Sequence, residues 1–169
     1  TKKNCMAIAF DSSTQDATSS DSAWNVPHTI ASGSDRLLIA CVSSGYGMSS
    51  VDHGMYSMTL VQRQTYSAPA YFIDWVVEIW SLIAPATGTN NLTFTPNRGP
   101  SSAISVGISS WTGVHQSTPT GTPSLTAQTT QANASISTSA ASATGDVVID
   151  ATAVYNRTLT EGSGQTALA

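Results

Sequence analysis

Short apolar runs separated by turn residues dominate the chain. Residues 36–43 form an almost continuous apolar run, residues 76–84 carry apolar side chains on both faces, and apolar side chains alternate with small residues along 103–111. A continuous run is typical of a strand buried on both faces, and alternation is typical of a strand with one buried face. We therefore predict a buried central strand at residues 36–43. The alternation in 76–84 places Glu78, Trp80 and Leu82 on one face.

Shorter runs predict the remaining strands. We expect them at residues 5–10, 24–30, 51–54, 57–63, 91–95 and 147–155, with a polar loop at 11–22. The Ser/Thr/Ala-rich region 117–144 is predicted as two weak surface strands, with a flexible linker as the alternative. Turn signals recur every 8–15 residues or so, which is typical of antiparallel sandwiches. The predicted fold class is all-β: a single domain over residues 1–169, an antiparallel, jelly-roll-like β-sandwich of about nine to eleven strands.

Hydroxyl groups, rather than charges, wet the surface of this predicted sandwich. Only 9% of the residues are charged, and the chain contains 26 Ser and 23 Thr. An average soluble domain carries about 25% charged residues. The net charge is −4, and there is no basic patch to bind a phosphate backbone. The longest apolar stretches are about half the ~20 residues of a membrane helix. We expect no nucleic acid and no membrane among the partners.

The sequence patterns of common catalytic sites are missing from the chain. The three histidines lie in no HxH or HExxH motif, and residues 107–111 lack the second glycine of a nucleophile elbow. Asp74 and Glu78 would lie ~13 Å apart on an extended strand, which is too far for a glycosidase carboxylate pair. We predict that the protein is not an enzyme. Glu78 is expected to face solvent or to pair with an arginine such as Arg63.

Two small groups of residues are candidates for local stabilisation. Asp11, Asp16 and Asp21 lie in the predicted polar loop and are candidate ligands of calcium, which takes carboxylate and carbonyl oxygens. Solvation of the loop is the alternative, and no other cofactor is expected. Cys5 and Cys41 are a candidate disulfide, or else two thiols that pack as small hydrophobic side chains.

Aromatic and polar side chains near predicted strand ends are candidates for sugar binding. Aromatic rings stack on sugar faces, and Asn and Asp side chains hydrogen-bond to the sugar hydroxyl groups. The candidate glycan-binding residues are Trp24, Trp75, Trp111, Tyr46, Tyr56, Asp52, Asn90 and Asn97. Packing at the edge of the core is the alternative interpretation of the tryptophans.

A series of motifs runs in order along most of the chain. They are PHT at 27–29, GSDRLLI at 33–39, VDHG at 51–54, MTLV at 58–61, VEIWSLIAPATGTN at 77–90, SWTGV at 110–114 and GDVV at 145–148. This order, over about residues 23–155, resembles a β-sandwich module of bacteriophage virion proteins and of secreted multidomain proteins from environmental bacteria. Such modules continue past a region like 162–169 into a final strand. The resemblance therefore implies that this sandwich lacks its last C-terminal strand or receives it from another chain.

The resemblance also implies a function. It indicates a non-enzymatic structural module of a tailed phage: a capsid decoration, head-fibre or tail-associated protein at the virion surface. Such a module acts through contacts with copies of itself or with other virion proteins, and through adhesion to surface glycans of the host. Two alternatives stay open, which are a secreted carbohydrate-binding module and an extracellular fibre subunit joined by strand exchange.

Overall fold

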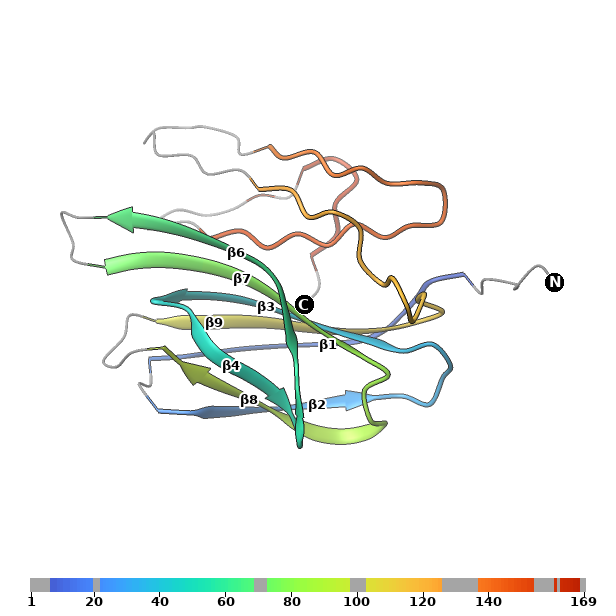
Figure 1. Cartoon of the computed structure of the whole chain (residues 1–169), viewed down its shortest axis with the longest axis horizontal. Helices are drawn as coiled ribbons and strands as arrows, with labels where there is room; N and C mark the ends of the chain where they lie inside the picture. The colour runs from blue at the N-terminus through green and yellow to red at the C-terminus, as the bar shows by residue number, and fades with distance from the viewer. Residues whose placement is uncertain are drawn as a thin grey trace.

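The protein is a sandwich of two antiparallel β-sheets (Figure 1). The computed structural model describes residues 7–19, 22–68, 73–97, 103–125, 137–153, 160 and 162–167. These residues form nine strands and no helix, and therefore no helix that could span a membrane. The strands are β1 (Ala9–Thr18), β2 (Trp24–Ile30), β3 (Leu37–Gly45), β4 (Met48–His53), β5 (Tyr56–Ser57), β6 (Thr59–Ala68), β7 (Ile73–Ile83), β8 (Gly88–Pro96) and β9 (Ile104–Thr112). One sheet has the order β1-β9-β3-β7-β6 and the other the order β2-β8-β4-β5. The predicted all-β sandwich is confirmed.

The main hydrophobic core lies between the two sheets. β3 occupies the centre of the five-stranded sheet, as predicted, and pairs with β7 on one side and β9 on the other. Leu38 and Val42 of β3 face the core, because side chains alternate along a strand. Phe94 from β8 and Ile108 from β9 are fully buried in the same cluster. The alternation seen in the sequence at 103–111 thus marks the inward face of β9, and Trp80 and Leu82, predicted on one face of 76–84, face the core from β7.

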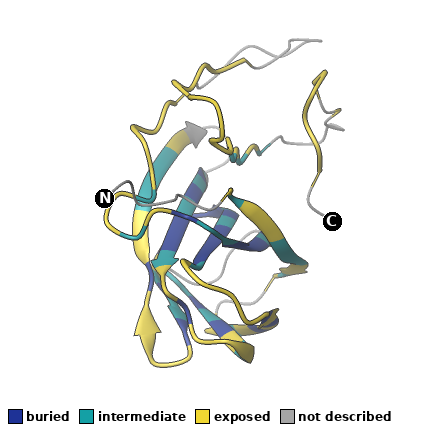
Figure 2. Ribbon diagram, turned by 90° about the vertical axis from the view of Figure 1, so that its right-hand side faces the viewer, coloured by how far each residue is buried: buried dark blue, intermediate teal, exposed yellow. Residues whose placement is uncertain are grey.

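A second apolar cluster lies on the outer face of the five-stranded sheet. Leu37, Ile39 and Trp111 are buried there, and Ile149 packs against them from the segment that follows β9. Residues 137–153 lie beside this sheet, on the side away from the four-stranded sheet (Figure 1). Buried residues gather on the strands, and most of the segment after β9 is exposed (Figure 2). Because β3 is covered on both faces, its sequence is almost continuously apolar.

The first strand differs from the prediction. Residues 11–22 are predicted to form a loop, yet β1 runs from Ala9 to Thr18 and pairs with β9. β1 is an edge strand, and its Ser12 and Thr14 hydrogen-bond to the buried His28 instead of joining the apolar core. A search for apolar periodicity therefore misses it. Of the strand expected at 5–10, the structure places Ala9 and Phe10 in β1, and residues 5 and 6 lie outside the described residues.

The strands predicted after β9 are not found in the part of the chain that the structure describes. Residues 147–153 have the alternation of a strand, and neither they nor residues 117–125 and 137–144 belong to one. Residues 126–136 and 154–155 lie outside the described residues. The segment 147–153 lies over the outer face of a sheet, where Ile149 packs, and not at a sheet edge, where its backbone would find a ladder partner.

Candidate functional site

An ion pair with a buried carboxylate and a partly exposed arginine fixes the turn between β3 and β4 to the five-stranded sheet. Glu78 of β7 is 1% exposed and pairs with Arg63, which lies opposite it on β6. The Glu78 carboxylate also accepts hydrogen bonds from the Met48 backbone N–H at 3.0 Å and from Trp80 Nε1 at 3.2 Å. The expected partner Arg63 is thus confirmed, and the expectation that Glu78 faces solvent is wrong. A carboxylate with this many structural donors is a support for the turn.

The turn itself holds two residues in the left-handed backbone region. Tyr46 has a φ of 86° and Gly47 a φ of 74°. A Cβ atom on residue 47 would lie 2.8 Å from Oε1 of Glu78, so this close approach requires glycine. A bulky residue with positive φ costs on the order of 1–3 kcal/mol, and such residues concentrate at binding sites. This turn is therefore a candidate functional surface.

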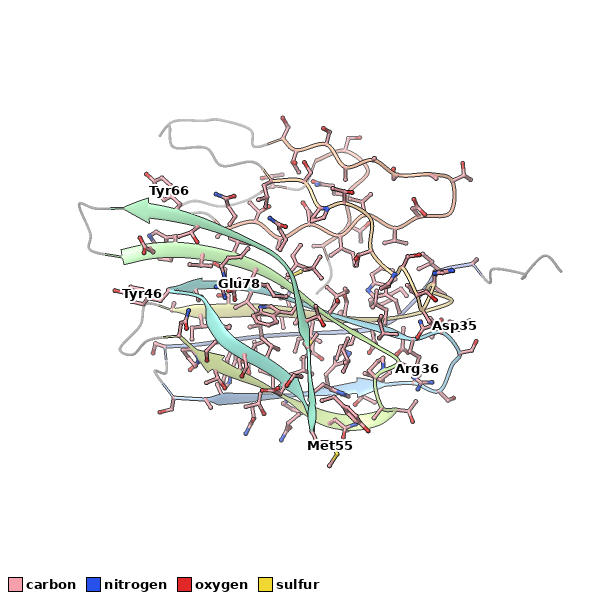
Figure 3. The ribbon with its side chains drawn as sticks, in the orientation of Figure 1. Asp35, Arg36, Tyr46, Met55, Tyr66 and Glu78 are labelled. Carbon is pink, nitrogen blue, oxygen red and sulfur yellow. The ribbon has the colours of Figure 1, made fainter. Side chains whose placement is uncertain are left out.

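Three aromatic residues and one asparagine lie around this turn, and we call this group the aromatic end: Tyr46, Tyr66, Trp75 and Asn97. Tyr66 of β6 lies directly opposite Trp75 of β7, and Trp75 lies opposite Gly45 of β3. Asn97 donates its backbone N–H to the Gly47 carbonyl at 3.0 Å. Tyr46 and Tyr66 lie at the same end of the sandwich (Figure 3). The structure thus brings together three of the predicted glycan-binding residues and adds Tyr66.

The other predicted glycan-binding residues lie elsewhere. Trp24 is half-buried, with its ring 5.6 Å from that of Phe94. Trp111 is 8% exposed and belongs to the outer-face cluster, so its ring is a packing group. The remaining three are distributed over the four-stranded sheet: Asp52 on β4, Tyr56 on β5 and Asn90 on β8.

A buried histidine connects the two sheets on the side where β1 and β2 lie. Thr14 Oγ1 lies 2.8 Å from His28 Nδ1, and Ser12 Oγ and Ser110 Oγ each lie 3.3 Å from His28 Nε2. Ser110 in turn donates a hydrogen bond of 2.8 Å to Asp11 Oδ2. Serine, histidine and aspartate therefore lie together, which calls for a comparison with a catalytic triad.

The order of the contacts differs from that of a triad. Ser110 lies between His28 and Asp11, so no carboxylate orients the imidazole ring. His28 and Ser110 are each 1% exposed, which leaves a substrate no path to the hydroxyl. Asp11 also accepts the backbone N–H of Ala31 at 3.0 Å. The contacts of the cluster join β1, β2 and β9 on one side of the sandwich.

A second buried histidine lies on the inner face of β4. His53 is 1% exposed, and neither of its ring nitrogens has a hydrogen-bond partner among the described residues. Burial lowers the pKa of His53 below its ordinary 6.5. Burial also lowers the pKa of His28, against an opposing effect of Asp11 and with a further lowering by His53. Both histidines are thus held in the neutral form by the fold.

We expect mild acid to destabilise the protein through these two histidines. Well above pH 6.5 both rings are neutral in the folded and the unfolded chain, so they contribute no pH dependence there. Below pH 6.5 the unfolded chain binds protons first, and the free energy of unfolding falls until the pH reaches the lowered folded pKa values. Urea unfolding at several pH values between 7.5 and 5.5 measures this slope. His53→Leu should flatten this slope. If the free energy of unfolding of His53→Leu fell as steeply with pH as that of the wild type, His53 would not be a source of the acid sensitivity.

The predicted calcium and disulfide residues are only partly described. Asp11 is engaged with Ser110 and Ala31, and Asp16 accepts the N–H of Ala17, while Asp21 lies outside the described residues. No three metal-binding side chains form a group within the described ranges. Cys41 is a free thiol whose pKa burial raises to about 12, with a further contribution from Asp150. Cys5 lies outside the described residues.

The edges of the two sheets differ in how they are protected from pairing with another chain. β2 contains Pro27, and β5 has only two residues. β1 is joined to β2 by side chains, including a 2.7 Å hydrogen bond from Ser12 Oγ to the Thr29 carbonyl. β6 has ten residues and contains neither proline nor lysine, and the charge of its Arg63 is paired with Glu78. We call this strand the β6 edge. By the devices that natural sheets use, it is the least protected of the four.

Comparison of the chain with protein-family models, with curated proteins and with solved structures finds no match. The function of the aromatic end and of the β6 edge is therefore inferred from the chain's own residues.

Proposed function

We propose that the protein is a non-enzymatic structural module of a tailed-phage virion, which acts at the virion surface as a capsid decoration, head-fibre or tail-associated protein. The observation that carries the proposal is the β6 edge. A long, unprotected edge strand is a template for pairing with another chain. The order of sequence motifs, which resembles that of virion β-sandwich modules, supports the same function.

The composition of the surface supports assembly as well. A chain in which 9% of residues are charged repels its own copies weakly, so many copies can pack side by side. His28 and Ser110 are buried and Asp11 is half-buried, which favours a structural role of this grouping over catalysis.

Binding to capsids tests the proposal. The protein should co-sediment, at a saturating copy number, with purified capsids of the phage whose genes surround its own. Thr65→Lys places a charge on the exposed part of the β6 edge and should weaken this binding at least tenfold. Asn25→Lys on the protected β2 edge is the matched control and should bind normally. A monomer that stays in the supernatant with such capsids contradicts the proposal.

The aromatic end favours a second candidate function, carbohydrate binding. A strained Tyr46 beside Trp75 and Tyr66 combines ring faces with the polar groups of Asn97. A glycan array on the isolated protein tests this candidate, and Tyr66→Ala should abolish any binding. Tyr56→Ala removes an exposed tyrosine from β5 and serves as the control. Absence of binding at millimolar sugar rejects this function.

A further inference from the structure

The segment 147–153 has the sequence of a strand without the pairing of one. Val147, Val148 and Ile149 are β-branched residues of high strand propensity. In the structure Val147 is 42% and Val148 59% exposed, and none of the seven residues is in a strand. The exposed aliphatic side chains and the unused strand propensity indicate a segment that has a further partner.

The same segment is loosely packed on its own molecule. A groove of about 500 Å³ lies between Ala151 and Thr152 on one side and the outer face of β1, β9 and β3 on the other. Gly107 at its floor leaves open space where a Cβ atom would lie. Ile149 packs on the outer-face cluster, but the residues around it are half-buried or exposed. Release of the segment from this face therefore breaks few contacts.

The β6 edge matches the segment in length and chemistry. Seven extended residues span ~23 Å, which is the length of residues 62–68 of β6, beyond the pocket that Thr59, Leu60 and Val61 share with Pro119 and Gly121. The outward-facing residues of β6 are polar and aromatic, with Gln62, Gln64 and Tyr66 on the outer face and Arg63 turned inward to Glu78. No charge on β6 is left to repel Asp150 of the incoming strand.

From these observations we propose that residues 147–153 of one copy add as a strand to the β6 edge of a second copy, which joins the copies by strand exchange. A second copy is the occupant because the chain carries both the donor strand and the acceptor edge. Within one molecule the segment lies over β3, where Asp150 is close enough to raise the pKa of Cys41. Because β7 lies between β3 and β6, the segment does not lie at the β6 edge of its own molecule. The inference rests on the proposed assembly function and names the partner of the β6 edge.

Cysteine cross-linking between copies tests this pairing. One preparation carries Thr65→Cys on β6, and seven others each carry a single cysteine at one position from 147 to 153, all with Cys5→Ser. Cys41 is also replaced by serine in every preparation, because its half-buried thiol lines the same groove as Ala151 and Thr152 and would otherwise form disulfides within one molecule. Equimolar mixtures are oxidised and the covalent heterodimers are measured by mass. We expect heterodimer yields that alternate with a period of two, differing several-fold between neighbouring positions, because successive side chains of a strand point to opposite faces.

The controls separate strand exchange from other contacts. Asn25→Cys on the β2 edge replaces Thr65→Cys as acceptor and should give no heterodimer above background. A uniform low yield at all seven positions overturns the proposal. So does a cross-link that forms within one molecule carrying both cysteines and fails to form in the mixtures. Alternating heterodimers without capsid binding would uphold strand exchange and reject the virion function. Capsid binding without heterodimers would uphold the virion function and reject strand exchange.

Discussion

The Glu78→Ala variant is expected to lose about 2–4 kcal/mol of its free energy of unfolding, mainly because it leaves buried hydrogen-bond donors without an acceptor, while Arg63 stays partly solvated. The loss is large because three groups lose their acceptor together: the Arg63 guanidinium, the Met48 N–H and Trp80 Nε1. A domain of ordinary stability has only about 5–15 kcal/mol in total. Urea unfolding followed by tryptophan fluorescence measures the change.

Two variants separate the ion pair from the general effect of losing a carboxylate. Asp74→Ala removes a half-buried carboxylate four residues earlier on the same strand and should cost within about 1 kcal/mol. Glu78→Gln keeps an acceptor for the Met48 N–H but leaves Arg63 without its counter-charge, so its stability should lie between those of the wild type and Glu78→Ala. If Glu78→Ala were as stable as Asp74→Ala, the ion pair would not be what holds the turn.

Phe94→Ala is expected to destabilise the sandwich by a similar amount, about 3–5 kcal/mol, because it empties a large volume in a closed core. Phe94 is fully buried between the sheets and also packs against the Trp24 ring. Strands on both sides of β8 hold the cavity open, since β8 is paired with β2 and β4. A thermal scan should show the midpoint falling by about 6–20 °C, at roughly 2–4 °C per kcal/mol for a domain of this size.

Phe10→Ala makes the same chemical change at the surface and serves as the reference. Phe10 is 49% exposed, and its ring contacts Trp111 edge-on at 5.4 Å. Such a contact contributes about 0.5–1.5 kcal/mol. Equal losses in the two variants would mean that Phe94 does not lie in the core.

The strands that the sequence predicts well are those whose side chains pack in the apolar core. The expected strand at 24–30 has the bounds of β2, and the continuous apolar run at 36–43 predicts the central position of β3. The partner of Glu78 is also predictable, since a lone carboxylate within an apolar strand requires an opposite charge when it is buried.

Features that depend on register and on polar partners are not predictable from one sequence. β1 is missed because Ser12 and Thr14 bind a histidine that lies more than ten residues along the chain. The pairing of Tyr66 with Trp75 depends on an irregularity in the β6–β7 register between Leu60 and Gln62, which shifts every later pair by one residue. The strand predicted at 147–155 is wrong for residues 147–153, because strand propensity in a sequence does not show whether a sheet edge lies within reach of the segment.

Because β1 pairs with β9, it cannot form its ladder during synthesis until β9 has been made. About 85 residues separate Thr18 from Ile104, and at roughly 5–20 residues per second their synthesis takes about 4–17 s. Throughout this interval β1 has no ladder partner. Its Ser, Thr and Asp side chains keep it hydrated during that wait, whereas an apolar strand of the same length would seek the edges of other nascent chains. The polarity that leaves β1 without a hydrophobic pattern thus allows this strand to stay unpaired until β9 has been synthesised.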